Sequence, residues 1–320
     1  MKRRLSFVLA AGLAVLGIVV VTSGVALAAE KARVGTALKG VVWMELPMMA
    51  AEERGFWKEQ NLEVEWTPFV GGGAMYRAMA GGHLQVGLSK IHSFTEAATG
   101  GVPGVIVADT GNEEFFEIWV RADSRIKKSE DLKGAKIGMA RGAAHISGIV
   151  IARGLGLEKD VKFVAVGGTP ERVAAVKAGA IDAFVQTFTP VVELMLKGEL
   201  RSVASEKPFL PKDRASDVVT AHKDFVRKNP ETVRRLIKAI LSSLAFIQEN
   251  RAWAIEKLRT NWRFSPEGAK LVYENLSFGK DGKINPKGVE NARSYLVEFG
   301  GVSKEKVPPL EQLYTVEFTG

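Results

Sequence analysis

The sequence predicts an α/β protein with two similar lobes, each a mainly parallel sheet flanked by helices. The first observation is an internal repeat, in which residues 62–94 align with a stretch that begins at Glu158, and Ala78 aligns with Ala175 at an offset of 97. The second is that each copy contains a strand, a Gly-rich turn, an amphipathic helix and a second strand. The third is that another strand and helix precede each copy. Because a strand–helix–strand crossover forces parallel pairing, we expect each copy to contribute to a parallel sheet.

Residues 1–28 are predicted to be a secretory signal peptide. The basic start MKRRLS, the apolar run FVLAAGLAVLGIVVVTSGV and the small-x-small site Ala26-Leu27-Ala28 occur in the order typical of such signals. The apolar run is long enough to cross a bilayer, so a retained anchor is the alternative. No second apolar run of that length follows, and we expect a soluble, exported mature chain.

Lobe I is predicted from residues 30–120 together with residues 213–320. A strand and a helix over residues 32–56 precede the first copy, which has strands at 62–69 and 84–89 and a helix that ends at Gly82. A further strand leads into IVADTGN (106–112). Asn229-Pro230-Glu231 begins a long helix whose apolar residues recur at 3–4 spacing, as on one buried face. Two more helices are predicted near 252–260 and 286–299.

Lobe II is predicted from residues 121–212. EFFEIWVRADS (114–124) is extended and apolar, which predicts a strand that crosses between the lobes, with a hinge near Trp119 and Leu200–Ser205. Ser129 caps a short helix, and a strand and helix then lead into the second copy. That copy has a Gly-rich turn at 167–170, a helix that ends at Gly179, and a strand over 181–187.

Composition excludes several classes of function. The net charge is +8, and removal of the three basic residues of segment 1–28 leaves +5, without the basic runs that nucleic-acid binders carry. The chain has no cysteine, which excludes disulfides and thiol chemistry. Its four histidines are scattered, and the sequence has no Gly-x-Ser-x-Gly motif. We therefore expect no metal, no cofactor and no enzyme activity.

Several motifs in order resemble one family. AAEERGFWKEQNLEVEWTPFVGGG (50–73) is similar to the signature of the nitrate/sulfonate/taurine-type periplasmic binding proteins of ABC importers, which share a fold with the NMT1/THI5-like pyrimidine-precursor proteins of thiamine biosynthesis. AVKAGAID (175–182) and ASDVVTAHKDFVRKNPETVRRLIKAI (215–240) fit the same pattern. The sequence departs from it at Gln85, where the family usually has Asp.

The resemblance implies a type II periplasmic-binding-protein-like fold, with a small solute held between two lobes. It also implies a monomeric periplasmic receptor that delivers its solute to a membrane permease driven by a separate ATPase. A periplasmic sensor for a signalling partner is an alternative that the sequence leaves open. An enzyme of the same fold is a third, although this chain lacks the cysteine-bearing motif associated with the thiamine-precursor synthases.

Candidate solute-binding residues follow the carboxyl ends of the predicted strands, where α/β sheets bind their ligands. The alternative for the lysines among them is a solvated surface charge, for the tryptophan a core position, and for the aspartate a turn cap. For the glycine at 72 it is close packing of the turn. The candidates are Leu38, Lys39, Gly40, Trp43, Gly72, Ser89, Lys90, Ile91, Asp109, Asn112, Gln186, Thr187 and Phe188.

Four further candidates mark a helix start in lobe II: Arg141, Gly142, Ala143 and His145. A helix N-terminus exposes unpaired N–H groups and a partial positive charge, and the arginine and histidine add donors. The alternative is tight helix–sheet packing beside a solvated arginine. Together with the apolar surfaces of Trp43 and Phe188, this group predicts a small anionic solute, such as an organic acid or sulfonate with an apolar or aromatic body.

Overall fold

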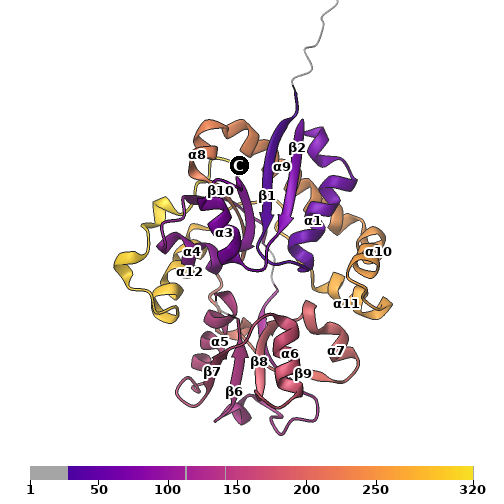
Figure 1. Cartoon of the computed structure of the whole chain (residues 1–320), viewed down its shortest axis with the longest axis vertical. Coiled ribbons are helices and arrows are strands. Elements are labelled where there is room, and N and C mark those ends of the chain that lie inside the picture. The colour runs from indigo at the N-terminus through magenta and orange to yellow at the C-terminus, as the bar shows by residue number, and fades with distance from the viewer. Residues whose placement is uncertain (1–27, 112–113, 141, 320) are drawn as a thin grey trace, which may run out of the picture.

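The computed structural model describes residues 28–111, 114–140 and 142–319, and these form two α/β lobes, each around a five-stranded sheet (Figure 1). The two-lobed architecture that the internal repeat predicts is confirmed. All of the predicted signal peptide except Ala28 lies outside the described residues. Within the described ranges, no helix is both long and apolar enough to cross a membrane.

The sheet of lobe I has the strand order β2-β1-β3-β10-β4. β1 is parallel to β2 and β3, whereas β10 is antiparallel to β3 and β4. The last strand therefore returns from a distant part of the chain and enters the middle of the sheet. The strands are β1 (Glu30–Thr36), β2 (Leu62–Pro68), β3 (Val86–Lys90), β4 (Gly104–Asp109) and β10 (Asp217–His222).

The sheet of lobe II has the equivalent order β7-β6-β8-β5-β9. β6 is parallel to β7 and β8, and β5 is antiparallel to β8 and β9. Each lobe therefore combines four strands that run in one direction with one strand, in the fourth place, that runs in the opposite direction. The strands are β5 (Phe116–Arg121), β6 (Lys136–Met139), β7 (Lys162–Ala165), β8 (Ala183–Thr187) and β9 (Leu200–Ser205).

The two strands of each repeat copy are parallel, as predicted, but they do not pair with each other. β1 lies between β2 and β3, with Val34 opposite Trp66 on one side and Val86 on the other. β6 is placed between β7 and β8 in the same way. Because right-handed crossovers that wind in opposite directions put their helices on opposite faces, this order covers both faces of each sheet.

Nine helices belong to lobe I and three to lobe II among the described residues, counting α-helices alone. The long helix predicted from Pro230 is confirmed as α9, with proline in its first turn. Lobe I has α1 (Val42–Glu53), α2 (Phe56–Glu59), α3 (Gly72–Ala80), α4 (Ile91–Thr99), α8 (Lys223–Lys228), α9 (Pro230–Glu249), α10 (Arg251–Asn261), α11 (Pro266–Asn275) and α12 (Pro286–Phe299). Lobe II has α5 (Ala143–Gly154), α6 (Thr169–Lys177) and α7 (Val192–Leu196).

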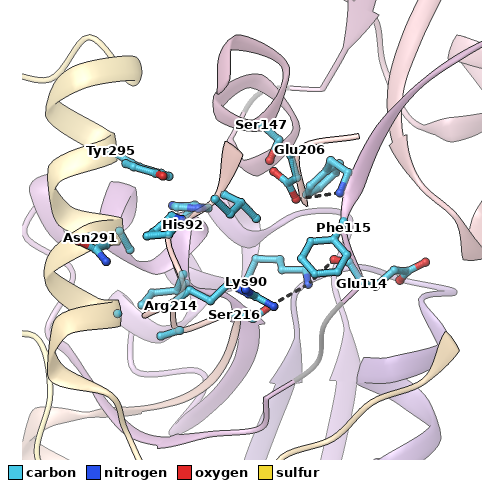
Figure 2. Close-up of a pocket in the computed structure, with 17 residues that line it drawn as sticks. Lys90, His92, Glu114, Phe115, Ser147, Glu206, Arg214, Ser216, Asn291 and Tyr295 are labelled. Atoms are coloured by element: carbon cyan, nitrogen blue, oxygen red, sulfur yellow. Dashed lines mark hydrogen bonds between the residues drawn. The ribbon is translucent and has the colours of Figure 1, made fainter. Parts of the chain in front are cut away.

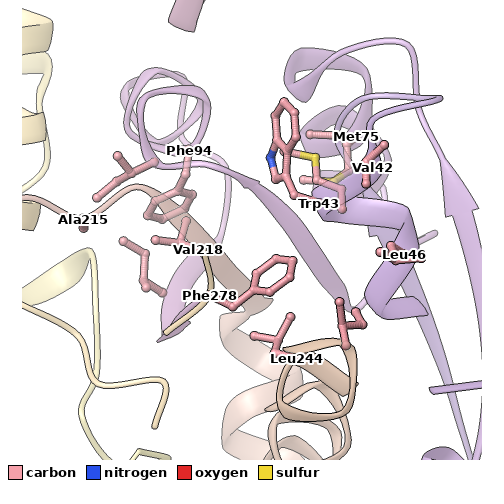
Figure 3. Packing of buried hydrophobic residues seen from close by; sticks show 14 of the residues in the cluster. Val42, Trp43, Leu46, Met75, Phe94, Ala215, Val218, Leu244 and Phe278 are labelled. Atoms are coloured by element: carbon pink, nitrogen blue, oxygen red, sulfur yellow. The ribbon is translucent and has the colours of Figure 1, made fainter. Parts of the chain in front are cut away.

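Apolar clusters cover the faces of the lobe I sheet. Met48 of α1 and Ile240 of α9 pack on strand residues in one cluster. A second cluster joins Trp43, Phe94 and Leu244 from α1, α4 and α9, and Figure 3 shows these side chains packed around Phe278. The amphipathic face of α9 is therefore divided between two clusters, which fixes this helix against the sheet.

The chain passes between the lobes twice, once between β4 and β5 and once between β9 and β10. Residues 116–120, which the sequence assigns to lobe I, lie in β5, and β5 pairs with β8 and β9. Trp119 is buried in lobe II, and its Nε1 donates to the Gln186 carbonyl at 3.0 Å. The hinge predicted near Trp119 and Leu200–Ser205 is wrong, because both segments are hydrogen-bonded strands. The crossings lie before Phe116 and over residues 206–216, which we call the second crossing segment.

Helix α12 lies directly against the second crossing segment. Gly288 is in its first turn, and a Cβ at this position would be 2.4 Å from the Arg214 carbonyl carbon and from the Ala215 nitrogen. Backbone atoms cannot turn aside as a flexible side chain can, so only glycine allows this approach.

We predict that Gly288→Ala lowers the free energy of unfolding by about 1–3 kcal/mol, because α12 must move away from the crossing segment. The matched control is Gly73→Ala in α3, where the nearest atom to a new Cβ is the flexible Arg77 guanidinium at 3.5 Å. That change is expected to stabilise by about 0.5–1 kcal/mol, since helical glycine costs backbone entropy. Urea unfolding measures the free energy of unfolding of both variants. Equal stability of the two variants would contradict the close contact at Gly288.

Candidate functional site

The two lobes face each other through the carboxyl ends of their parallel strands. β1 ends toward lobe II and β6 ends toward lobe I (Figure 1). Predicted residues that follow these ends include Leu38 and Lys39, which are exposed, and Gly40, whose positive φ suits the turn before α1. The carboxyl ends of the strands, after which the candidate residues were chosen, therefore face the opposite lobe as expected.

Lys90, at the end of β3, is the polar centre of the junction between the lobes. It is 7% exposed, and its Nζ forms an ion pair with Asp217 of β10 at 3.0 Å. The same Nζ donates to the Glu114 carbonyl and to Ser216 Oγ, each at 3.3 Å. The surface-charge alternative for Lys90 is wrong, because this ammonium links lobe I to both crossings of the chain.

Trp43 contributes an aromatic surface to the same place. Lys90 Nζ lies 5.3 Å from the centre of the Trp43 ring, within the range of a cation–π contact. The indole is buried in the lobe I core, and its Nε1 has no hydrogen-bond partner among the described residues. Trp43 is therefore a core residue that also has a donor without a partner among the described residues. The sequence analysis considered Trp43 as a binding surface or as a core residue, but not as both.

Glu114 is a functional candidate that the sequence analysis missed. Its Oε1 accepts a hydrogen bond from the Thr189 N–H at 2.6 Å, which ties the first crossing to the loop after β8. Its Oε2 is buried and has no partner among the described residues. Burial raises the pKa of Glu114 to about 7, against the hydrogen bonds from Thr189. A single acidic residue before an apolar run carries no periodic signal, so only its position in space reveals it.

Asp109, at the end of β4, caps a turn. It is 8% exposed, and its Oδ1 accepts from the Gly111 N–H at 2.8 Å. Burial raises the pKa of Asp109 to about 7, and the nearby carboxylate of Asp217 adds to this. The structure thus supports the turn-cap interpretation of Asp109. The neighbouring candidate, Asn112, lies outside the described residues.

Several predicted residues serve packing. Ser89 is buried, and its Oγ lies 2.7 Å from the Tyr76 hydroxyl. Ile91 is buried at the start of α4. Gly72 packs against α4, because a Cβ here would be 2.6 Å from Ser93 Cβ. The packing alternative therefore accounts for Gly72.

Lobe II contributes the residues that end β8. Gln186 is 7% exposed and donates through Nε2 to Thr169 at the start of α6. Thr187 is buried, and the half-buried Phe188 packs against clusters of both lobes. These residues face lobe I at the same junction as Lys90, since Thr189 of the same loop contacts Glu114.

The predicted anion site at the start of α5 has a carboxylate of the protein beside it. Gly142 has a φ of 86°, followed by Ala143, and the half-buried His145 donates its backbone N–H to the Gly142 carbonyl at 3.0 Å. A Cβ on Gly142 would lie 3.5 Å from Glu96 Oε2 of α4 in lobe I. Arg141, the residue expected to grip the anion, lies outside the described residues.

A pocket of about 50 Å³, open to water-sized molecules, lies beside the crossings, between α4, α5 and α12. Figure 2 shows Phe115 turned into it, while the Glu114 side chain points away to the other side of the first crossing. Lys90 is part of its lining, so the pocket and the strand-end walls share one centre. The sequence analysis missed the other polar residues that line it, which include His92, Ser147, Glu206, Arg214, Asn291 and Tyr295.

The lobes also touch on two flanks away from Lys90. Arg153 of α5 forms an ion pair with Glu298 of α12 at 2.6 Å. On the other flank, Glu193 of α7 accepts hydrogen bonds from Ser265 N and Oγ at 2.8 and 2.9 Å, at the start of α11. These contacts join the two lobes, and we call this arrangement closed.

The family follows from a match that covers most of the chain. The NMT1/THI5-like family model matches residues 45–254. The chain belongs to this family. A relative is the taurine-binding periplasmic protein of Escherichia coli K12, 26% identical over 61% of this chain and 61% of its own length. The chain thus aligns with less than two thirds of that relative.

Another curated protein and a solved structure match as well. A Saccharomyces cerevisiae 4-amino-5-hydroxymethyl-2-methylpyrimidine phosphate synthase, THI13, is 23% identical over 65% of each chain. Among solved structures, the alkanesulfonate-binding protein SsuA of Xanthomonas axonopodis has a TM-score of 0.73 at 15% identity, covering 89% of this chain and 98% of its own. The likeness confirms the predicted periplasmic-binding-protein fold.

We predict that Asp109→Asn stabilises the protein at high pH. The folded-state pKa of Asp109 lies above its ordinary value of 3.8, so its burial costs stability as pH rises from about 4 to about 7. Asparagine keeps the acceptor for the Gly111 N–H and cannot ionise. At pH 8 the variant should be more stable by about 1–3 kcal/mol, and at pH 4 the two proteins should agree.

The matched control for this prediction is Asp281→Asn, which changes an exposed turn-capping aspartate. Asp281 accepts from the Lys283 N–H at 3.1 Å, and that bond lowers its pKa, so the control should not be stabilised at pH 8. Urea unfolding of wild type and both variants at the two pH values measures the difference. A wild-type stability that does not fall relative to Asp109→Asn between pH 4 and pH 8 would contradict the buried, destabilising charge.

Proposed function

We propose that this protein is the periplasmic solute receptor of an ABC importer. The observation that carries the proposal is a buried polar centre at the one place where both lobes and both crossings meet. Lys90 from lobe I contacts Glu114 of the first crossing and Ser216 of the second, and Glu114 in turn contacts Thr189 of lobe II. A solute at this centre touches both lobes, so its binding favours the closed arrangement.

The cycle follows from how few segments join the lobes. Two crossings allow the lobes to part, which breaks the contacts at Glu193 and Arg153 and admits solute and water. Solute that binds both walls draws the lobes together again, and the flanking contacts re-form. The closed form then docks as a monomer on a membrane permease, and a separate ATPase drives release. Relatives named as periplasmic binding proteins support this role.

The solute is proposed to be small and anionic, an organic acid or a sulfonate. Lys90 supplies a buried positive charge, the start of α5 supplies backbone N–H groups, and Trp43 supplies an aromatic surface. The Glu96 carboxylate is near these N–H groups as well, because a Cβ on Gly142 would lie 3.5 Å from its Oε2. The taurine-binding and alkanesulfonate-binding relatives support the same chemical class.

We propose binding without turnover. The synthases among the relatives are 23% identical, and this chain has no cysteine to supply thiol chemistry. Within the described residues, no group of three histidine, aspartate or glutamate side chains is placed to hold a metal ion. Mass spectrometry of solutes before and after incubation with the protein is expected to show no product.

Thermal and chemical unfolding with a solute panel tests the proposal. The panel contains sulfonates, carboxylates, aromatic acids and nitrate, with neutral sugars as controls. A true solute at about one hundred times its dissociation constant should add about 2.7 kcal/mol to the free energy of unfolding. Native mass spectrometry of protein from its own host should show the same solute bound. A panel without any shift, and a protein without any added mass, would contradict a receptor function.

A further inference from the structure

Two residues next to Lys90 each have a buried polar atom without a partner among the described residues, and the two atoms have opposite hydrogen-bonding character. Glu114 Oε2 is an acceptor when the carboxyl group is ionised, as it is above its raised pKa of about 7, and Trp43 Nε1 is a donor. Lys90 Nζ lies 3.3 Å from the Glu114 carbonyl oxygen and 5.3 Å from the Trp43 ring centre, so the two residues are neighbours across the ammonium. Buried polar groups in native proteins are nearly always paired, and exceptions call for a specific partner.

The two residues belong to different moving parts. Trp43 is the second residue of α1 and is packed in the core of lobe I. Glu114 is in the first crossing and is attached to lobe II through the Thr189 N–H. A molecule that bonds to both atoms therefore connects lobe I to lobe II. Without it, the closed arrangement leaves both atoms without a partner among the residues that the structure describes, and opening exposes them to water.

The contacts of Lys90 show why its ammonium does not donate a hydrogen bond to Glu114 Oε2. The Lys90 ammonium is directed to Asp217, to Ser216 Oγ and to the backbone carbonyl of Glu114. The carboxylate of Asp109 is a further nearby acid, and Glu206 is another within reach of the Lys90 charge. The three donors of the Lys90 ammonium are all used by its three hydrogen-bond partners, and among the described residues it offers no further donor to Glu114 Oε2.

We infer that the solute carries a hydrogen-bond donor, an amine or a hydroxyl, that binds Glu114 Oε2, together with an acceptor for Trp43 Nε1. This inference rests on the proposed function and narrows it: an amino- or hydroxy-substituted acid fits, whereas nitrate or an unsubstituted acid leaves Glu114 unsatisfied. Glu114 is thus the residue that discriminates among acids, and Trp43 binds the acceptor common to them all.

The experiment compares pairs of probes that differ only in the donor: β-alanine and propionate, lactate and propionate, and taurine and ethanesulfonate. Isothermal titration calorimetry with the wild-type protein should show at least one pair whose donor-bearing member binds at least 10-fold more tightly. Pairs that bind with equal affinity, or with the donor-lacking member tighter, overturn the inference and leave the receptor function intact. If no probe in the pairs or in the wider solute panel binds, the receptor function fails, and this inference fails with it.

Glu114→Gln should reverse the preference within the pair. The glutamine oxygen must keep the bond from the Thr189 N–H, so its NH2 group replaces Oε2 and offers a donor where the wild type offers an acceptor. Affinity for the donor-bearing probe is expected to fall at least 10-fold, and affinity for the donor-lacking probe is expected to hold or rise. The removal of a buried ionisable group favours folding of this variant, which thermal unfolding checks.

Two further variants make the result specific. Glu117→Gln changes a half-buried carboxylate of β5 whose pKa is also raised by burial, and it should leave the discrimination unchanged. Trp43→Phe keeps the ring and removes the donor, so it should weaken both probes of a pair by a similar factor. If Glu117→Gln reverses the preference as Glu114→Gln does, or if Glu114→Gln leaves it unchanged, the assignment of Glu114 is wrong.

Discussion

The buried ion pair of Lys90 and Asp217 is the constraint on which the junction between the lobes depends. An ammonium and a carboxylate removed from water cost several kcal/mol each, and the cost is offset only when further hydrogen bonds complete their surroundings. Here Ser216 Oγ and the Glu114 carbonyl do so. Because these partners come from both crossings, the position of the ion pair fixes where each crossing leaves lobe I.

This constraint places polar chemistry beside both crossings of the chain. The crossings run close to Lys90, so any group that binds there contacts the segments about which we propose that the lobes move. α12 secures the second crossing through the contact at Gly288, and α5 and α7 provide flanking contacts between the lobes. In the proposed cycle, the closed and open arrangements differ mainly in a few interlobe contacts and in the hydration of the junction, which a small solute is able to outweigh.

Sequence reasoning predicts those parts of the fold that rest on local patterns. The internal repeat predicts the two lobes. The glycines at helix ends and the apolar periodicity of α9 predict individual helices. The insertion of β1 between β2 and β3, and the membership of β5 in lobe II, depend on pairings between distant segments, which no local pattern encodes. The same division holds at the site. Lys90 and Trp43 are predicted as site residues because they follow the ends of predicted strands. Glu114 becomes recognisable only through its contact with Thr189 in the folded chain.

The central claim is that a solute at the Lys90 junction draws the two lobes together, and distance measurements by pulsed electron paramagnetic resonance test it most directly. The chain has no cysteine, so cysteines introduced at Val70 in lobe I and Ala174 in lobe II, both exposed, carry the only spin labels. The account predicts a broad distance distribution without solute and a shorter, narrower one at saturation. An unchanged distribution with solute bound, as shown by calorimetry on the same labelled protein, would contradict it.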